Sequence, residues 1–185
     1  MTAPSAETVR AVPHTVLRLE VAVGASFDDF RRRYEQAVPR LDAGQLERLK
    51  NDNADWDAVL QAAEENAPHG FIIYWANDPA SLMKLAGDPG RCVSYLMGNH
   101  TIAQRMYHHD PGIMLYAPLR TAIYEDAHGV TWFSVDQPST CFASFGVPAI
   151  TEVGAELDRK LASLLGFLGA PVPDALTSAT VPARP

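Results

Sequence analysis

Three of the six histidines lie close together near the middle of the chain, at His100, His108 and His109. Imidazole is a frequent metal ligand and titrates near neutral pH, so it can also act as a general acid or base. His108 follows His100 by eight residues, about 11 Å along a helix, whereas helical ligand pairs are four residues apart. The spacing therefore argues against a metal site here. His108 and His109 suit a helix end, and His100 is the best candidate for a catalytic residue.

A haem is the second chemistry that His100 could support, because one axial histidine in an apolar, aromatic cavity is sufficient. Soft and aromatic side chains surround it in sequence, namely Tyr95, Met97, Met106, Tyr107, Met114 and Tyr116. Methionines and aromatic residues at such spacing more often belong to the hydrophobic core than to a haem pocket. The sequence has no Cys-x-x-Cys-His motif, so covalent attachment of a haem is excluded.

The two cysteines, Cys92 and Cys141, form no Cys-x-x-Cys pair, so a thiolate zinc site is not expected. Ser139-Thr140-Cys141 follows a predicted strand and turn, where a cysteine could act as a nucleophile. No Gly-x-Ser-x-Gly elbow or cysteine-protease signature accompanies it. We therefore interpret both cysteines as inert thiols, and whether they lie near each other stays open.

Arg120 lies in a long predicted strand and could bind a carboxylate or phosphate through two parallel hydrogen bonds. Pairing with Asp136 across the sheet is the preferred interpretation of this residue. No glycine-rich phosphate loop is present, because Gly87-Asp88-Pro89-Gly90 has the composition of a turn.

Charge and composition exclude several classes of partner. The formal net charge of -7 argues against nucleic acid and against an anionic membrane surface. The first residues lack the apolar stretch of a secretory signal, and no run approaches the roughly 20 apolar residues of a membrane helix. We therefore expect a cytoplasmic protein with reduced thiols.

The elements that must position these residues follow from the spacing of apolar side chains. The pattern predicts strands over 14–23, 70–76, 91–97, 112–125 and 130–135. It predicts helices over 27–38, 45–50, 55–66, 80–86, 101–109 and 151–168, the last with a clear apolar face. Strands and helices segregate along the chain, which is typical of an α+β domain with a mainly antiparallel sheet. We expect flexible tails at 1–12 and at the proline-rich segment 171–185, and one domain over 13–170.

Residues 93–168 resemble family 302 of the domains of unknown function, which occurs in bacteria and archaea. The marks that carry the resemblance are Gly98-Asn99, Ala103 and Met106 in the following helix, Asp110-Pro111-Gly112, Leu115-Tyr116-Ala117-Pro118-Leu119-Arg120, Ile123-Tyr124-Glu125-Asp126, Asp136-Gln137-Pro138-Ser139 and the closing leucine-rich helix. Residues 14–38 match the first strand and helix of the family more weakly.

The resemblance implies a curved antiparallel sheet with a long C-terminal helix packed across it, a layout similar to that of the TATA-binding protein, and often a homodimer. It implies no established reaction, and fold alone supplies none. His100 stands where many members have proline, which exchanges a rigid turn residue for a possible ligand. Residues 39–69 form a longer connection than usual, which could cap a pocket or extend an interface.

We therefore expect a protein that binds a small apolar molecule in a pocket between the sheet and the 151–168 helix. Its polar contacts are expected from Asn99, His100, Tyr116, Arg120 and Tyr124, because such pockets combine apolar walls with a few polar groups. The alternatives are a haem protein with His100 as axial ligand, a cofactor-free enzyme with His100 as acid–base, and a structural dimer without a ligand.

Overall fold

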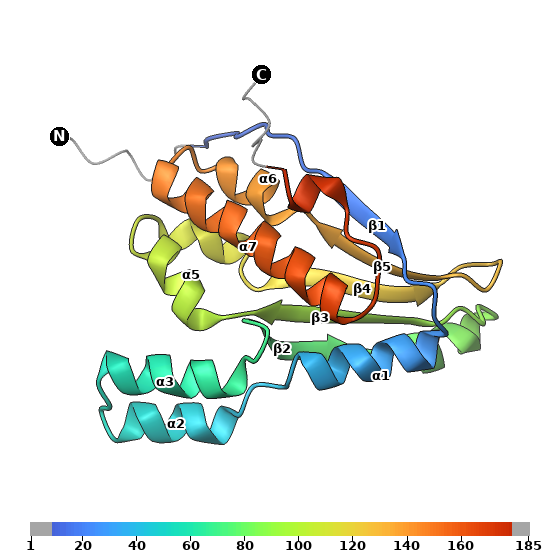
Figure 1. Cartoon of the computed structure of the whole chain (residues 1–185), viewed down its shortest axis with the longest axis horizontal. Coiled ribbons are helices and arrows are strands. Elements are labelled where there is room, and N and C mark those ends of the chain that lie inside the picture. Colours follow the sequence, from blue (N-terminus) through green and yellow to red (C-terminus); the bar gives the residue numbers. More distant parts are fainter. Residues whose placement is uncertain (1–8, 179–185) are drawn as a thin grey trace.

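A five-stranded antiparallel sheet organises the chain in the computed structural model, which describes residues 9–178 (Figure 1). The strand order is β1-β5-β4-β3-β2, and every neighbouring pair is antiparallel. The strands are β1 Arg18–Ala22, β2 Ile72–Asn77, β3 Cys92–Gly98, β4 Leu119–Glu125 and β5 Thr131–Asp136. The predicted α+β class with a long C-terminal helix is confirmed.

Helices cover one face of this sheet and extend its ends. They are α1 Phe27–Ala37, α2 Ala43–Asn51, α3 Trp56–Asn66, α4 Ala80–Met83, α5 His100–Tyr107, α6 Pro138–Ala143 and α7 Pro148–Phe167, with the 3-10 turns η1 Lys84–Ala86, η2 Pro111–Leu115 and η3 Asp174–Leu176. Ser26 caps the start of α1, because its hydroxyl accepts a hydrogen bond from the Asp29 backbone N–H at 3.2 Å and so satisfies a free donor of the first turn.

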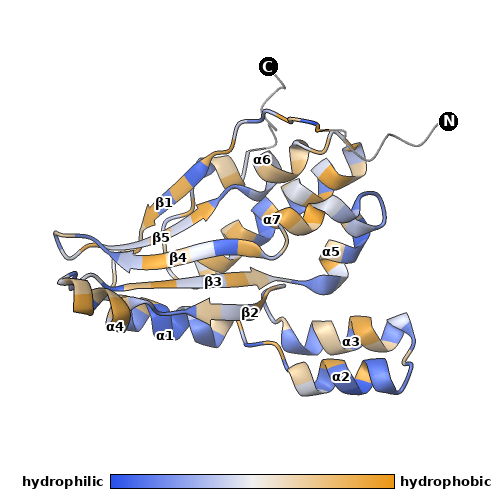
Figure 2. Cartoon of the chain, turned by 180° about the vertical axis from the view of Figure 1, so that it is seen from behind, coloured by the Kyte–Doolittle hydropathy of each residue, from blue (hydrophilic) through white to orange (hydrophobic). Residues whose placement is uncertain are grey.

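The core lies between the sheet and the helices α1 and α7. Alternate side chains of each strand point into it, including Val21, Phe133 and Ile123, which are buried. The apolar stripe of α7 supplies Leu161 and Leu164, both fully buried. Seen from behind, the strands lie in front and no helix of residues 9–178 crosses them (Figure 2). The outward side chains of β1, β4 and β5 therefore face solvent.

The segment before β4 and the segment after β5 fold differently from the prediction. The expected strand over 112–125 begins only at Leu119, because Asp110 caps the turn η2 by accepting a hydrogen bond from the Gly112 N–H at 2.7 Å. Pro111 occupies the first position of that turn, where its fixed φ suits a helical start. The short helix α6 was missing from the prediction, since Pro138 looked like the end of a strand rather than the first residue of a helix.

The connection over 39–69 forms the antiparallel hairpin α2–α3, which extends from one end of the sheet (Figure 1). The proline-rich segment from 171 differs from the predicted flexible tail over its described part, because Leu176 in η3 is buried in the core. At the other end, residues 9–12 carry no regular structure and are exposed, and the rest of the tail expected over 1–12 lies outside the described residues.

At Gly154 the helix α7 packs closely against α6. A Cβ at this position would lie 3.1 Å from Ser139 Cα and 3.1 Å from Phe142 Cβ. Alanine in a helix interior normally stabilises by about 1 kcal/mol relative to glycine. Here the backbone of Ser139 can yield only if α6 shifts, so we expect Gly154→Ala to lower the free energy of unfolding by about 1–2 kcal/mol, the usual cost of overpacking.

Urea denaturation checks this prediction, and Gly166→Ala is its control. Gly166 lies in the same helix, and its Cβ would meet only Val172 Cγ2, at 3.9 Å. We expect that second substitution to be neutral or stabilising. Equal stabilisation by both substitutions would contradict the close approach of the two helices.

Candidate functional site

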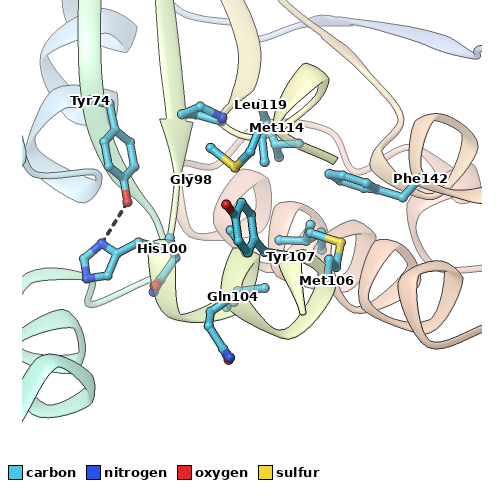
Figure 3. Close-up of a pocket in the computed structure, with 15 residues that line it drawn as sticks. Tyr74, Gly98, His100, Gln104, Met106, Tyr107, Met114, Leu119 and Phe142 are labelled. Atoms are coloured by element: carbon cyan, nitrogen blue, oxygen red, sulfur yellow. Dashed lines mark hydrogen bonds between the residues drawn. The ribbon is translucent and has the colours of Figure 1, made fainter. Parts of the chain in front are cut away.

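A cavity of about 370 Å³ lies where β3 ends and α5 begins (Figure 3). Its walls come from β2, the β3–α5 turn with α5, the turn η2 and the loop that leads into β4, the start of β4, α6 and α7. The lining residues are Tyr74, Gly98, Asn99, His100, Ile102, Ala103, Gln104, Met106, Tyr107, Met114, Ala117, Pro118, Leu119, Phe142 and Leu157. None of them is Asp, Glu, Lys or Arg, and most present carbon atoms to the cavity.

The turn from β3 into α5 shapes this cavity. The Asn99 side chain caps α5 by accepting hydrogen bonds from the Thr101 N–H at 2.9 Å and from the Thr101 hydroxyl at 2.7 Å. Gly98 leaves the cavity open beside it, because a Cβ there would lie 3.4 Å from Pro118 and 3.8 Å from a ring carbon of Tyr74. The cavity therefore depends on a residue without a side chain at the end of β3.

Tyr74 and His100 form a hydrogen-bonded pair at one side of the cavity. The Tyr74 hydroxyl lies 2.9 Å from His100 Nδ1, and this is the dashed contact in Figure 3. A register shift in β2 between Ile73 and Trp75 places Tyr74 in a bulge. A bulge changes the direction in which a side chain points. At this bulge the Tyr74 phenol points toward His100 at the start of α5.

Burial keeps both members of this pair uncharged. It raises the pKa of Tyr74 to about 12 and lowers the pKa of His100. At neutral pH the phenol is protonated and the imidazole is neutral. The two groups can then exchange donor and acceptor roles along one hydrogen bond without placing a charge in the cavity.

The lowered pKa of His100 predicts a loss of stability in mild acid. The unfolded imidazole, with a pKa of about 6.5, binds a proton more readily than the folded one. The contribution of the neutral His100 imidazole to the free energy of unfolding is therefore present above about pH 6.5. It is lost as the pH falls through the pKa of the folded state. We expect the free energy of unfolding to drop between about pH 7.5 and about pH 5. Urea denaturation at both pH values should show a smaller drop for His100→Gln, and an equal drop would contradict the burial of this imidazole.

A second, much smaller hollow lies on the far side of His100, beneath the α2–α3 hairpin. It measures about 20 Å³ and is lined by Leu41, Asp42, Gln45, Leu46, Leu49, Ala62, Ala63, Asn66, Ile72 and His100. In Figure 3 the imidazole extends away from Tyr107 and Met114, so that Nε2 faces this side. His100 and Tyr74 thus form part of the wall between the cavity and the hairpin.

The other residues that the sequence singled out lie elsewhere. The Tyr116 hydroxyl is 2.9 Å from His14 Nε2, and the Tyr124 hydroxyl donates to Glu20 at 2.9 Å on the outer face of the sheet. Neither Arg120, which is exposed on that face, nor these tyrosines line the cavity. Asp136, the expected partner of Arg120, lies 3.7 Å from Arg18 instead. Of the five expected ligand contacts, the structure brings together Asn99 and His100.

The remaining candidates lack the surroundings of a reactive site. Cys92 and Cys141 are free thiols, and burial raises the pKa of Cys141 to about 11, so that this sulfur is protonated at neutral pH. His108 and His109 are exposed after the end of α5. Across residues 9–178, no three His, Cys, Asp or Glu side chains are grouped so that they could hold a metal ion. In the same residues no helix combines the length and apolar character of a membrane span.

Tyr74 and Leu157 are among the lining residues that sequence reasoning missed. Tyr74 lies in an apolar strand and resembled core, while Leu157 belongs to the leucine stripe of α7. The Gly98-Asn99 pair was visible in the sequence as the end of a strand. The bulge that turns Tyr74 toward His100 leaves no signal in residue spacing alone.

Comparison with known proteins gives a family and a fold. No curated protein matches the chain. The crystal structure of an uncharacterized conserved DUF302 protein from Bacillus stearothermophilus is similar, with a TM-score of 0.57 and 17% identity, over 80% of this chain and 95% of that one. At this identity the likeness shows the fold. The model of the domain of unknown function DUF302 matches residues 48–168, from within the α2–α3 hairpin to the end of α7. Because this match spans more than half of the sequence, the chain belongs to the DUF302 family.

Proposed function

We propose that the protein binds a small, largely apolar molecule in the cavity beneath α5. The observation that carries this proposal is the cavity itself, because its 370 Å³ falls within the usual range of ligand pockets, about 300–1,000 Å³, and its walls are mostly carbon. Burying apolar ligand surface against such walls supplies the binding free energy, about 25 cal/mol for each Å² removed from water. The few polar groups at the rim would orient the ligand.

The orientation of His100 favours this function over haem binding or acid–base catalysis. Nδ1 is engaged by Tyr74, and Nε2 faces the hairpin rather than the cavity (Figure 3). An axial ligand or a general base must direct a free nitrogen at the iron or at the reacting atom. The proposal therefore assigns binding to the pocket and no reaction. The homodimer that the resemblance implies stays a prediction, which light scattering would check.

Two measurements test the proposal. Native mass spectrometry of the freshly purified protein should show an additional organic mass that is lost on denaturation. The neutral dye Nile red should bind with a fluorescence increase and a stoichiometry of about one per chain, as expected for one apolar pocket. Absence of both signals would favour a structural protein without a ligand. An absorption band near 400 nm, typical of a porphyrin iron site, would instead restore the haem alternative.

A further inference from the structure

The polar and apolar walls of the cavity lie on opposite sides. Tyr74 and His100 lie on one side in Figure 3 and Phe142 on the other, with Tyr107 and Met114 between them. The amide of Gln104 points away from Phe142 and from Leu119 in the same view. A ligand that fills this space therefore meets the hydrogen-bonding groups of Tyr74 and His100 at one end and mostly carbon elsewhere, with the Tyr107 hydroxyl between the two sides.

We propose that the ligand is an uncharged molecule with one terminal oxygen, an alcohol or a ketone, and that the Tyr74 hydroxyl is the group that binds this oxygen. This inference rests on the proposed function and names the class of ligand. An anion or a cation in the cavity would meet no opposite charge, because none of the lining residues is ionised at neutral pH, and burying an unpaired charge is strongly unfavourable.

The hydrogen bond between Tyr74 and His100 explains why both oxygen types fit. For an alcohol, the ligand O–H donates to the Tyr74 oxygen, and the Tyr74 O–H donates to His100 Nδ1, which is 2.9 Å away. For a ketone, Nδ1–H donates to the Tyr74 oxygen, and the Tyr74 O–H donates to the ligand carbonyl. The imidazole has a tautomer for each arrangement, so that His100 is a positioning residue that acts through Tyr74.

The hollow beneath the hairpin makes both tautomers possible. His100 Nε2 carries a proton in the first arrangement and a lone pair in the second, so its neighbour must accept or donate accordingly. The hollow of about 20 Å³ is large enough for one water molecule, and Asp42, Gln45 and Asn66 line it beside His100. Water can meet either need, which an amide in a fixed orientation cannot.

Displacement of Nile red by four eight-carbon probes tests the ligand class. The probes are 1-octanol, 2-octanone, octanoate and octylammonium. We expect the two neutral probes to displace the dye at concentrations at least about tenfold lower than the two ions, since only the ions must lose hydration without gaining a partner. Equal displacement by all four would overturn the inference but leave the proposed function standing. Absence of both dye binding and a co-purified mass in the wild type would overturn the proposed function itself.

Two variants test the role of Tyr74. Tyr74→Phe should weaken both neutral probes by about 2- to 13-fold, the range that one net hydrogen bond provides. Tyr124→Phe removes a hydroxyl from a tyrosine on the outer face of the sheet, outside the cavity, and should change neither affinity. A Tyr74→Phe protein that unfolds as cooperatively as the wild type yet binds both probes equally well would overturn the assignment.

Nitrogen-15 NMR of His100 tests the positioning role separately. The Nε2–H tautomer is expected with 1-octanol and the Nδ1–H tautomer with 2-octanone, because the two ligands reverse the direction of the Tyr74–His100 hydrogen bond. A purely structural histidine would keep one tautomer with both probes. That result would overturn the proposed role of His100.

Discussion

Replacing Gly98 with valine is expected to weaken ligand binding strongly while leaving the protein folded. The new Cβ would lie in the gap between Pro118, at 3.4 Å, and Tyr74, at 3.8 Å, both of which line the cavity. The two methyl groups beyond it would occupy space that the ligand needs. We expect Nile red affinity to fall by about tenfold or more, within the 1–3 kcal/mol that overpacking costs, with an intermediate loss for Gly98→Ala.

Gly90→Val is the matched control for this substitution. A Cβ at Gly90 meets nothing within 4 Å, and neither Gly98 nor Gly90 has a left-handed backbone, so valine strains neither position. Valine is also favoured in strands, and Gly98 ends β3. We therefore expect both variants to unfold at denaturant concentrations close to that of the wild type. Unchanged dye affinity in a folded Gly98→Val protein would place the binding site outside this cavity.

The sequence predicted where the candidate site lies better than it predicted which residues form that site. Gly98, Asn99 and His100 stood out because a strand ends and a capped helix begins there, and both features are local. Tyr74 reaches the same place only because β2 contains a bulge and pairs with the end of β3. Pairing between strands that are distant in sequence is not encoded in the spacing of either strand.

Arg120 and Tyr124 show how residues of a predicted strand can lie outside the candidate cavity. They lie four positions apart in β4, so their side chains share one face of the sheet. Leu119, Thr121 and Ile123 alternate with them and point to the buried face. The period of two predicts this division but does not say which face borders a cavity. Because the cavity lies beneath α5 at the end of the sheet, only Leu119 of this strand reaches it.

The carboxylate of Asp158 holds the helix α6 in place. Sequence reasoning predicted neither this helix nor the role of this carboxylate. Asp158 of α7 is buried and accepts hydrogen bonds from the Ser139 N–H at 3.0 Å and from Gln137 Nε2 at 2.7 Å. The same Gln137 nitrogen donates to the Ala175 carbonyl at 2.9 Å. Asp158 and Gln137 together therefore link α7, α6 and the segment that contains η3, and α6 in turn carries Phe142 into the cavity wall.

Asp158→Ala is accordingly expected to cause the largest loss of stability among the substitutions considered. It would leave a buried backbone N–H and one donor of Gln137 without partners, at about 1–3 kcal/mol each. The carboxylate is itself costly to bury, as its raised pKa indicates, and its removal relieves that cost. We therefore expect a net loss of about 2–4 kcal/mol in urea denaturation.

Asp158→Asn separates the two hydrogen bonds of this carboxylate. The asparagine oxygen can still accept from the Ser139 N–H, but its amide would face Gln137 Nε2, whose orientation is fixed by the Ala175 carbonyl. We expect an intermediate loss, and faster hydrogen exchange at the Leu176 N–H in both variants, because Gln137 without its carboxylate partner holds that segment less firmly. Glu152→Ala changes an exposed carboxylate of the same helix and should leave both measurements unchanged. A loss below about 1 kcal/mol for Asp158→Ala would mean that apolar packing alone holds α6 in place, and the cavity wall that Phe142 forms would then not depend on this carboxylate.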